Sequence, residues 1–156
     1  MSKTTSFGYD LNGNTVIKTL GNGLLEERTH DARNRVSSLN NQNSDGSDLA
    51  GYVYAYDLEG NVRQITESYA AGSLALAART ITNSYDGVYR LVTEQIDTAG
   101  SGTVTTLYIY DKANNRVSEY VGGAPGGTTY LIGNGNNGAG ANQIKSITPV
   151  KHQLSR

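Results

Sequence analysis

Five aspartates recur along the chain at similar spacing, and carboxylates are the groups that acid–base catalysis or calcium binding would use. The steps between them are 21, 26, 29 and 25 residues. An enzyme needs one special site, whereas equivalent carboxylates at a repeated position favour a repeated structural unit. We therefore expect no catalytic residue among them. The five are Asp10, Asp31, Asp57, Asp86 and Asp111.

Calcium binding has one candidate segment, Asp10 to Asn14, which begins like an EF-hand loop. The sixth position of that loop is Thr15 and the twelfth is Gly21. An EF-hand needs glycine at the sixth position and a bidentate glutamate at the twelfth. The segment therefore does not predict a metal site, and we expect none in the chain.

The remaining titratable residues do not form a pattern that is typical of catalysis. His30 precedes Asp31 at the place where tyrosine stands in the other repeats, so an aromatic packing role is expected. His152 has no acidic partner pattern for a triad or a zinc site. Glu26 and Glu27 are adjacent in an expected strand and point to opposite faces. The prediction is a protein that is not an enzyme and that has no cofactor.

Each aspartate begins a sequence that is typical of a tight turn. Asp-x-x-Gly favours a type I turn in which the carboxylate accepts backbone N–H groups. The fourth residue then takes a positive φ, for which glycine is the cheapest choice and asparagine the next. Tyr89 breaks this rule, so we expect a different turn there that uses Gly87. The expected turn residues are Tyr9, Asp10, Gly13, His30, Asp31, Asn34, Tyr56, Asp57, Gly60, Tyr85, Asp86, Tyr110, Asp111 and Asn114.

The residues on either side of these turns alternate as β-strands do. Residues 51–56 and 103–110 approach a turn, and residues 61–66 and 116–121 return from one. Looser glycine-rich loops are expected at the opposite ends of the hairpins, and a strand is favoured over a helix at residues 70–78. The fold class predicted is all-β, with antiparallel stacked hairpins that form an open strip too short to close into a shell.

Composition and charge exclude several classes of partner. The chain has 156 residues, which permits one domain with a core, and it contains 19 Gly, 11 Tyr and no Cys. A net charge of −1 gives no electrostatic case for nucleic acid. No apolar run approaches the length that spans a bilayer, so membrane insertion is not expected.

Together, the repeated motifs of residues 7–121 resemble the Rhs/YD-repeat family, with a degenerate extension to Ile147. Tyr56-Asp57-Leu58-Glu59-Gly60-Asn61 is a clear copy of the pattern that begins at Tyr9. The resemblance implies a strip of stacked hairpins, which spirals into a hollow shell in Rhs polymorphic toxins, in the cocoon components of insecticidal Tc toxins and in teneurins. In these proteins the shell encloses a toxic domain or presents an adhesive surface.

The chain departs from the large members of that family in two respects. It lacks the Asp-Pro-x-Gly motif of the boundary between core and toxin, since its only prolines are Pro125 and Pro149. No tail is long enough to be a toxin domain. We therefore expect a short repeat segment that lacks a toxin domain and its autoproteolysis.

The expected organisation has four parts. Residues 1–132 form the hairpin array, and residues 133–143 form a mobile Gly/Asn-rich loop. Residues 144–148 form a degenerate final repeat strand, and residues 149–156 form a disordered tail. The sequence leaves the compartment open, and secretion or display at the cell surface would lack a recognisable signal peptide in this chain.

Two kinds of partner are expected. An array of hairpins exposes unpaired edge strands, which predicts a homo-oligomer, a fibre-like stack or pairing with a companion YD-repeat chain. The alternative is an adhesin or carbohydrate-binding module that would use a tyrosine-rich face of the sheet. That face would contain Tyr52, Tyr54, Tyr56, Tyr108 and Tyr110.

Overall fold

A computed structural model shows a protein made of β-strands, and it describes residues 4–70, 76–122, 128–132 and 144–149. The expected all-β class is confirmed: these residues form an open antiparallel sheet, and no helix occurs among them. The order of the strands in the sheet is their order in the chain. The strands are Ser6–Tyr9 (β1), Thr15–Thr19 (β2), Leu25–His30 (β3), Val36–Gln42 (β4), Asp48–Tyr56 (β5), Val62–Tyr69 (β6), Arg79–Tyr85 (β7), Leu91–Thr98 (β8), Gly102–Tyr110 (β9), Arg116–Val121 (β10), Thr128–Ile132 (β11) and Ile144–Pro149 (β12).

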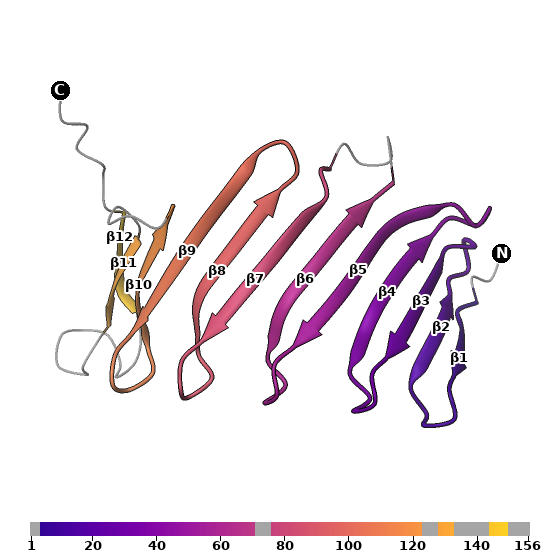
Figure 1. The fold of residues 1–156 in the computed structure, drawn as a ribbon, viewed down its shortest axis with the longest axis horizontal. Helices are drawn as coiled ribbons and strands as arrows, with labels where there is room; N and C mark the ends of the chain where they lie inside the picture. Colours follow the sequence, from indigo (N-terminus) through magenta and orange to yellow (C-terminus); the bar gives the residue numbers. More distant parts are fainter. Residues whose placement is uncertain (1–3, 71–75, 123–127, 133–143, 150–156) are drawn as a thin grey trace. The chain divides into compact units, whose positions relative to one another are not determined.

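Contacts divide the chain into two compact units. Unit 1 contains residues 1–81 and 97–102, and unit 2 contains residues 82–96 and 103–156. In unit 1, β1 to β6 follow one another across the sheet (Figure 1), and each pairs with the next in antiparallel register. In unit 2, the pairs β9–β10, β10–β11 and β11–β12 are antiparallel.

Tight turns that begin with aspartate join the strands along one end of the hairpins, which we call the turn edge. At the first of them, the Asp10 N–H donates to the Asn14 carbonyl at 3.0 Å, and the Gly13 N–H donates to the Asp10 carbonyl at 3.1 Å. Gly13 has a φ of 84°. This is a type I turn followed by a positive-φ residue, a connection that is common in β-hairpins. The turn edge comprises residues 10–14, 31–35, 57–61, 86–90 and 111–115.

Tyr89 does not change the turn, contrary to our expectation. Its N–H donates to the Asp86 carbonyl at 3.0 Å, and its own φ is 64°, so it takes the position that glycine or asparagine holds elsewhere. Gly87 is not among the residues with positive φ. The backbone geometry of the hairpin is therefore imposed on a tyrosine, at a cost of about 1–2 kcal/mol for a left-handed residue with a Cβ.

The connections at the opposite end of the first hairpins are not loose, which corrects the sequence-based expectation. The Leu20 N–H donates to the Leu24 carbonyl at 2.8 Å, and the Gly23 N–H donates to the Leu20 carbonyl at 2.8 Å. The segment 43–47 closes with the same two bonds, at 2.8 and 3.0 Å. These connections have the length and geometry of the turn edge, although the first begins with leucine.

The connection between β6 and β7 is longer. β7 begins at Arg79, and residues 76–78 belong to neither a strand nor a helix, so the strand expected at 70–78 is wrong in that part. Residues 71–75 lie outside the described residues. So do residues 133–143, where a mobile loop was expected, and residues 150–156 of the tail expected at 149–156, whose first residue, Pro149, ends β12. The degenerate final strand was expected at 144–148, where β12 lies.

The sheet has almost no buried interior. Among the residues whose side chains are described, Ala50 is the only buried hydrophobic residue, at 8% exposure. The chain is long enough for a core, but the described strands are consecutive in a sheet, and no helix among the described residues packs on them. Stability must therefore come mainly from contacts between neighbouring strands and hairpins.

Candidate functional site

The carboxylates of the turn edge bind the backbone of their own turns. At the second turn, Asp31 Oδ1 accepts the N–H of Arg33 at 2.8 Å and the N–H of Arg35 at 3.0 Å. Three other aspartates accept the corresponding two N–H groups, at 2.8 to 3.0 Å. Asp57 differs, since its Oδ1 accepts from Gly60 at 2.8 Å and from Asn61 at 2.7 Å. The three with the common pattern are Asp10, Asp86 and Asp111.

The residue four positions after each aspartate defines two classes of turn. In Asn-type turns its amide donates to the second carboxylate oxygen, as Asn61 does to Asp57 Oδ2 at 2.8 Å. In Arg-type turns a guanidinium does so, as Arg35 Nε does to Asp31 Oδ2 at 2.7 Å. The Asn-type turns contain Asn14, Asn61 and Asn115, and the Arg-type turns contain Arg35 and Arg90.

These bonds lower the pKa of all five carboxyls, because they favour the charged form. The main cause differs between the classes. The Asn61 side chain contributes most to the lowered pKa of Asp57, whereas the backbone N–H of Arg35 contributes most to that of Asp31. Carboxylates held in this way are engaged in bending the backbone.

Each Arg-type turn also contacts the hairpin that follows it. The Arg35 guanidinium carbon lies 4.2 Å from the centre of the Tyr56 ring, which is within cation–π distance. The Tyr56 hydroxyl donates to the Val36 carbonyl at 2.7 Å. In unit 2, Arg90 lies 4.6 Å from the centre of the Tyr110 ring, and the Tyr110 hydroxyl donates to the Leu91 carbonyl at 2.8 Å. We call this pair of contacts the Arg–Tyr interlock.

Further hydrogen bonds cross between turns in the same place. Arg33 NH1 donates to the Leu58 carbonyl at 2.7 Å, and Arg35 NH1 lies 3.5 Å from the Asp57 carbonyl. In unit 2, Arg90 NH1 reaches the Asp111 carbonyl at 3.3 Å and Asn114 Oδ1 at 2.7 Å. The Arg-type turn of each unit is thus bound through arginine to the turn that follows it.

The first two turns are joined by amides instead of by an arginine. The Nδ2 groups of Asn12 and Asn14 donate to Asn34 Oδ1 at 3.2 and 2.9 Å. Asn34 has a φ of 58°, so it serves both as the positive-φ residue of its turn and as the acceptor for the preceding one. This contact is weaker in kind than the interlock, because neither partner is charged.

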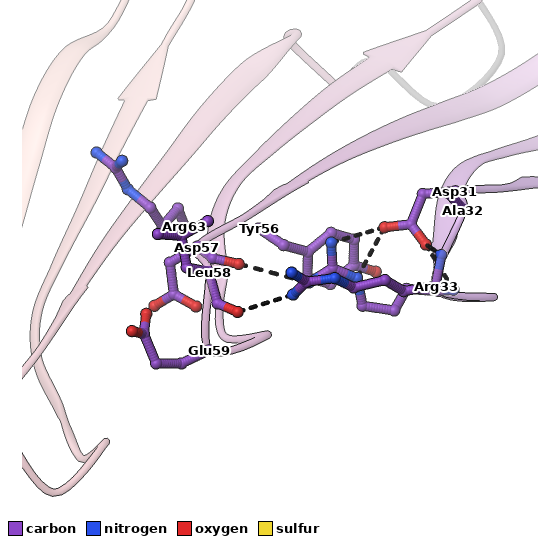
Figure 2. A pocket seen from close by; sticks show the side chains of 9 residues that line it. Asp31, Ala32, Arg33, Tyr56, Asp57, Leu58, Glu59 and Arg63 are labelled. Atoms are coloured by element: carbon purple, nitrogen blue, oxygen red, sulfur yellow. Dashed lines mark hydrogen bonds and ion pairs between the residues drawn. The ribbon is translucent and has the colours of Figure 1, made fainter.

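An open groove of about 670 Å³ lies between the second and third turns of unit 1. It is lined by Asp31, Arg33, Arg35, Tyr56, Asp57 and Glu59, among others. Figure 2 shows Arg33 reaching from the Asp31 turn to the backbone of the next turn, with the Tyr56 ring beside it. The polar groups of the groove are largely engaged with one another, so the groove has the character of a joint between hairpins.

The tyrosine-rich face is present on β5, where Tyr52, Tyr54 and Tyr56 are half-buried and alternate with the exposed Val53 and Ala55. Tyr52 packs edge-on against Tyr69 at a distance of 6.5 Å between ring centres. Burial raises the pKa of Tyr54. These rings therefore contact neighbouring strands of the sheet, and a role in ligand binding stays a prediction.

On β9 of unit 2, Tyr108 and Tyr110 are half-buried on either side of the exposed Ile109. Burial raises the pKa of Tyr108, as it does for Tyr54 at the equivalent place of unit 1. The arginine that follows the turn aspartate by five residues, Arg116, lies 5.3 Å from the centre of the Tyr108 ring. Arginine side chains thus lie near both tyrosine rings of this strand that were expected to belong to the ligand-binding face.

A cluster of Glu67, Tyr69 and Arg79 was not foreseen from the sequence. Glu67 is 6% exposed, and its Oε2 accepts from the Tyr69 hydroxyl at 2.6 Å and from Arg79 Nε at 2.5 Å. Burial acts to raise the pKa of Glu67, but the hydrogen bonds from Arg79 and Tyr69, together with the charge of Arg79, outweigh it and the pKa is lowered. The bond to Glu67 raises the pKa of Tyr69 to about 12. The one feature of the sequence that could have indicated this cluster is the position of Glu67, two residues from Ile65 and two from Tyr69, which places all three on one face of a strand.

The other residues considered from the sequence do not gather into a reactive site. Glu26 is half-buried and forms an ion pair with Arg28, whereas Glu27 is exposed, as the alternation of strand faces requires. His30 lies at the end of β3 in the tyrosine position. No group of three or more His, Asp or Glu residues that could hold a metal occurs in the described part of the chain. The described residues also contain no helix of the length and apolarity needed to cross a membrane.

No protein-family model matches the sequence, and no curated protein matches it either. Solved structures do share the fold. The crystal structure of TcdB2-TccC3-TEV matches 91% of this chain with a TM-score of 0.68 and 19% identity, and the chain spans 8% of its length. The Tc holotoxin pore of Photorhabdus luminescens, with a mutation in TccC3, matches 97% of this chain with a TM-score of 0.60 and 17% identity, over 10% of its length. The chain therefore has the fold of a small part of these Tc toxin structures.

Proposed function

We propose that this chain is a non-enzymatic structural protein, a strip of YD-repeat hairpins that associates with other β-chains into a larger Rhs-like assembly. The observation that carries this proposal is the Arg–Tyr interlock, which recurs in both units. Residues that could have formed a reactive site hold the hairpins instead: Asp31 binds the backbone of its own turn, and Arg35 stacks on Tyr56 of the following hairpin. A contact between hairpins that repeats along a chain is what an extendable array requires.

The fold comparison supports the same proposal. One of the similar structures is a Tc holotoxin pore. A strip that matches a small fraction of a large toxin chain is suited to a structural part in an assembly. Among the described strands β1 pairs with β2 alone, and the unpaired N–H and C=O groups of such an edge strand can recruit another strand.

Light scattering after size-exclusion chromatography tests the association. We expect a mass above that of the monomer that rises with concentration, and strips, rings or filaments in electron micrographs. Phe7→Lys on β1 places a charge on an edge strand, where Phe7 is 52% exposed, and is expected to shift the population toward monomer. Val53→Lys is the matched control, since Val53 is 56% exposed on a central strand. A monodisperse monomer of the unmodified chain at ~100 μM would contradict the proposal.

The carbohydrate-binding alternative has less surface than the sequence suggested. One face of the Tyr56 ring and one face of the Tyr110 ring are covered by guanidinium groups. Tyr52 is engaged by Tyr69. Since sugars bind to uncovered aromatic faces, these contacts favour the structural function over the adhesin. Tyrosine fluorescence that changes with millimolar sugar would restore the alternative.

A further inference from the structure

A pocket of about 270 Å³ lies in unit 1 at the end of the hairpins opposite the turn edge. Residues of β2 to β5, which lie side by side in the sheet, contribute to it (Figure 1). Four leucines line it, and we call it the leucine pocket. They are Leu20, Leu24, Leu25 and Leu49. Ala50, the one buried hydrophobic residue among the described side chains, also belongs to the lining, so an apolar group that enters the pocket leaves water on several sides.

The pairing of the strands places a row of polar residues along this pocket. Lys18 is opposite Glu26, Glu26 is opposite Asn41, and Asn41 is opposite Ala50. Residues directly opposite one another on neighbouring strands lie on the same face of a sheet. Two of the leucines belong to the turn that joins β2 to β3, two positions from the first two members of the row. The pocket therefore has apolar walls at the turn and polar groups beside them.

The carboxylates in this region are already engaged. Glu26 forms an ion pair with Arg28, so the negative charge in the lining is balanced by a guanidinium. Asp48 lies outside the lining, and its Oδ1 accepts from Asn40 Nδ2 at 2.7 Å and from Gln42 Nε2 at 3.0 Å. Neither carboxylate is paired with the ammonium group of the pocket.

That ammonium group belongs to Lys18, which is half-buried in the lining. No ion pair of Lys18 occurs among the described residues. The amide of Asn41, two rows of strands away, can also donate hydrogen bonds. The polar side of the leucine pocket thus offers one unbalanced positive charge and neutral donors, which together suit a single anionic group.

The volume limits the ligand to a short chain. An apolar cavity of about 150 Å³ accommodates benzene, so a volume of about 270 Å³ accommodates roughly ten non-hydrogen atoms. A lipid with two long acyl chains exceeds this size. Octanoate matches it and carries one negative charge at the end of an apolar chain.

We propose that the leucine pocket binds a free medium-chain fatty acid. The carboxylate of the ligand lies at Lys18, and its chain lies among Leu20, Leu24 and Leu49. This binding activity goes beyond the proposed function, because it needs no second protein chain. Both halves of the ligand are required, since the apolar chain supplies most of the affinity and the charge selects the head group.

Titration of the full chain, labelled with ¹³C at its leucine methyl groups, tests the inference by NMR. Octanoate should shift the signals of Leu20, Leu24 and Leu49 and leave those of Leu91 and Leu107 in unit 2 unchanged. Butyrate, which lacks four methylene groups, should bind roughly 20- to 200-fold more weakly. Octylamine has the same chain and the opposite charge, and should bind roughly 5- to 20-fold more weakly.

Two lysine variants identify the head-group contact. Lys18→Met keeps an apolar stem and removes the charge, so it should weaken octanoate binding roughly 3- to 5-fold and leave the binding of octan-1-ol unchanged. Lys112→Met, at an exposed lysine of the fifth turn in unit 2, is the matched control and should change neither. Equal effects of Lys18→Met on octanoate and octan-1-ol would contradict the assignment of the carboxylate. Unchanged leucine signals of the unmodified chain at ~10 mM octanoate would overturn the inference without any variant.

Sedimentation with vesicles of phosphatidylglycerol distinguishes a free acid from a membrane lipid as the source of the chain. We expect the protein to remain in the supernatant, because the leucine pocket is too small for two acyl chains. Co-sedimentation that Lys18→Met abolishes would assign the pocket to a lipid and rule out the free acid.

Discussion

The interlock of unit 1 and that of unit 2 place the same cation over the same ring, but they complete the joint differently. In unit 1 the third turn has Gly60 at its positive-φ position, and Arg33 of the preceding turn bonds the Leu58 carbonyl. In unit 2 that position holds Asn114, which accepts from Arg90 itself. In unit 1 two arginines, Arg33 and Arg35, bond to the following turn, whereas in unit 2 Arg90 alone does so.

The difference shows which parts of the joint are interchangeable. Val88 occupies the place of Arg33 in unit 2, and its side chain cannot donate a hydrogen bond. Asn114 offers the side-chain acceptor that Gly60 lacks. The residue two positions after the first aspartate and the positive-φ residue of the following turn therefore differ together between the units. The stacked arginine and tyrosine are the same in both. The stacked pair is the constant element, and the hydrogen bonds around it are adjustable.

The largest effect is expected from removing the constant arginine. Arg90→Ala should cost roughly 1–3 kcal/mol of unfolding free energy in unit 2, since it removes the stacking, the ion pair with Asp86 and the bonds to the fifth turn. Arg35→Ala should cost about 1 kcal/mol less in unit 1, because Arg33 still bonds the next turn. Hydrogen exchange of amides in each unit measures both changes.

Lysine variants are the control for that experiment. Arg90→Lys retains the charge but loses the planar fork, so it should recover only part of the stability. Equal costs of Arg35→Ala and Arg90→Ala would contradict the idea that unit 1 divides the joint between two arginines.

Giving the joint of unit 1 the residue types found in unit 2 is expected to have the next largest effect on stability. Arg33→Val should cost roughly 0.5–1.5 kcal/mol by removal of one hydrogen bond. In the background of Gly60→Asn the cost should be smaller, since a Cβ at Gly60 would lie 3.7 Å from Arg35 NH1 and the amide could accept from it. A double-mutant cycle from urea denaturation measures the coupling, and strict additivity would show that the two sites are independent.

Relieving the strained residue of the fourth turn should stabilise unit 2. Tyr89 has a φ of 64° and is exposed, so Tyr89→Asn should raise the unfolding free energy by roughly 0.5–1 kcal/mol. Val88→Asn, one residue earlier and without positive φ, should leave it nearly unchanged. A loss of stability in Tyr89→Asn would show that the ring makes a contact worth more than the strain.

Acid should weaken both classes of turn. The loss of stability at any single turn should be smaller than the loss caused by substituting an arginine of the joint. The pKa of each turn carboxyl is lowered from 3.8 in the folded chain. The stabilisation is therefore present above pH 3.8 and is lost as the pH falls through the folded value. Urea midpoints at pH 7 and pH 3 measure the loss, which should be smaller in Asp111→Asn. Glu59→Gln, whose carboxylate does not bond a turn, should leave the loss unchanged.

The hairpins were predictable because local chemistry determines them. Asp10 and Gly13 fix a turn within five residues, and the alternation around Tyr54 fixes which face is covered. Tyr89 could not be placed from propensity, since the register of β7 and β8 on either side forces its conformation. The turn at Leu20 was missed for a related reason, because it forms without a carboxylate.

The contacts between hairpins were harder to derive. Arg35 and Tyr56 are 21 positions apart, and only the register of intervening strands brings them together. Arg79 reaches Glu67 across the connection between β6 and β7. The alternation of Asn and Arg is visible in the sequence, but its meaning depends on knowing which ring each guanidinium covers.

The near absence of buried apolar side chains has a thermal consequence. Heat capacity rises on unfolding in proportion to the apolar surface exposed, by ~12–15 cal/mol/K per residue in ordinary globular domains. A sheet in which Ala50 is the one buried hydrophobic residue among the described side chains exposes less new apolar surface when it melts. Its free-energy curve should therefore bend gently with temperature, so that cooling weakens it little and calorimetry records a shallow baseline step.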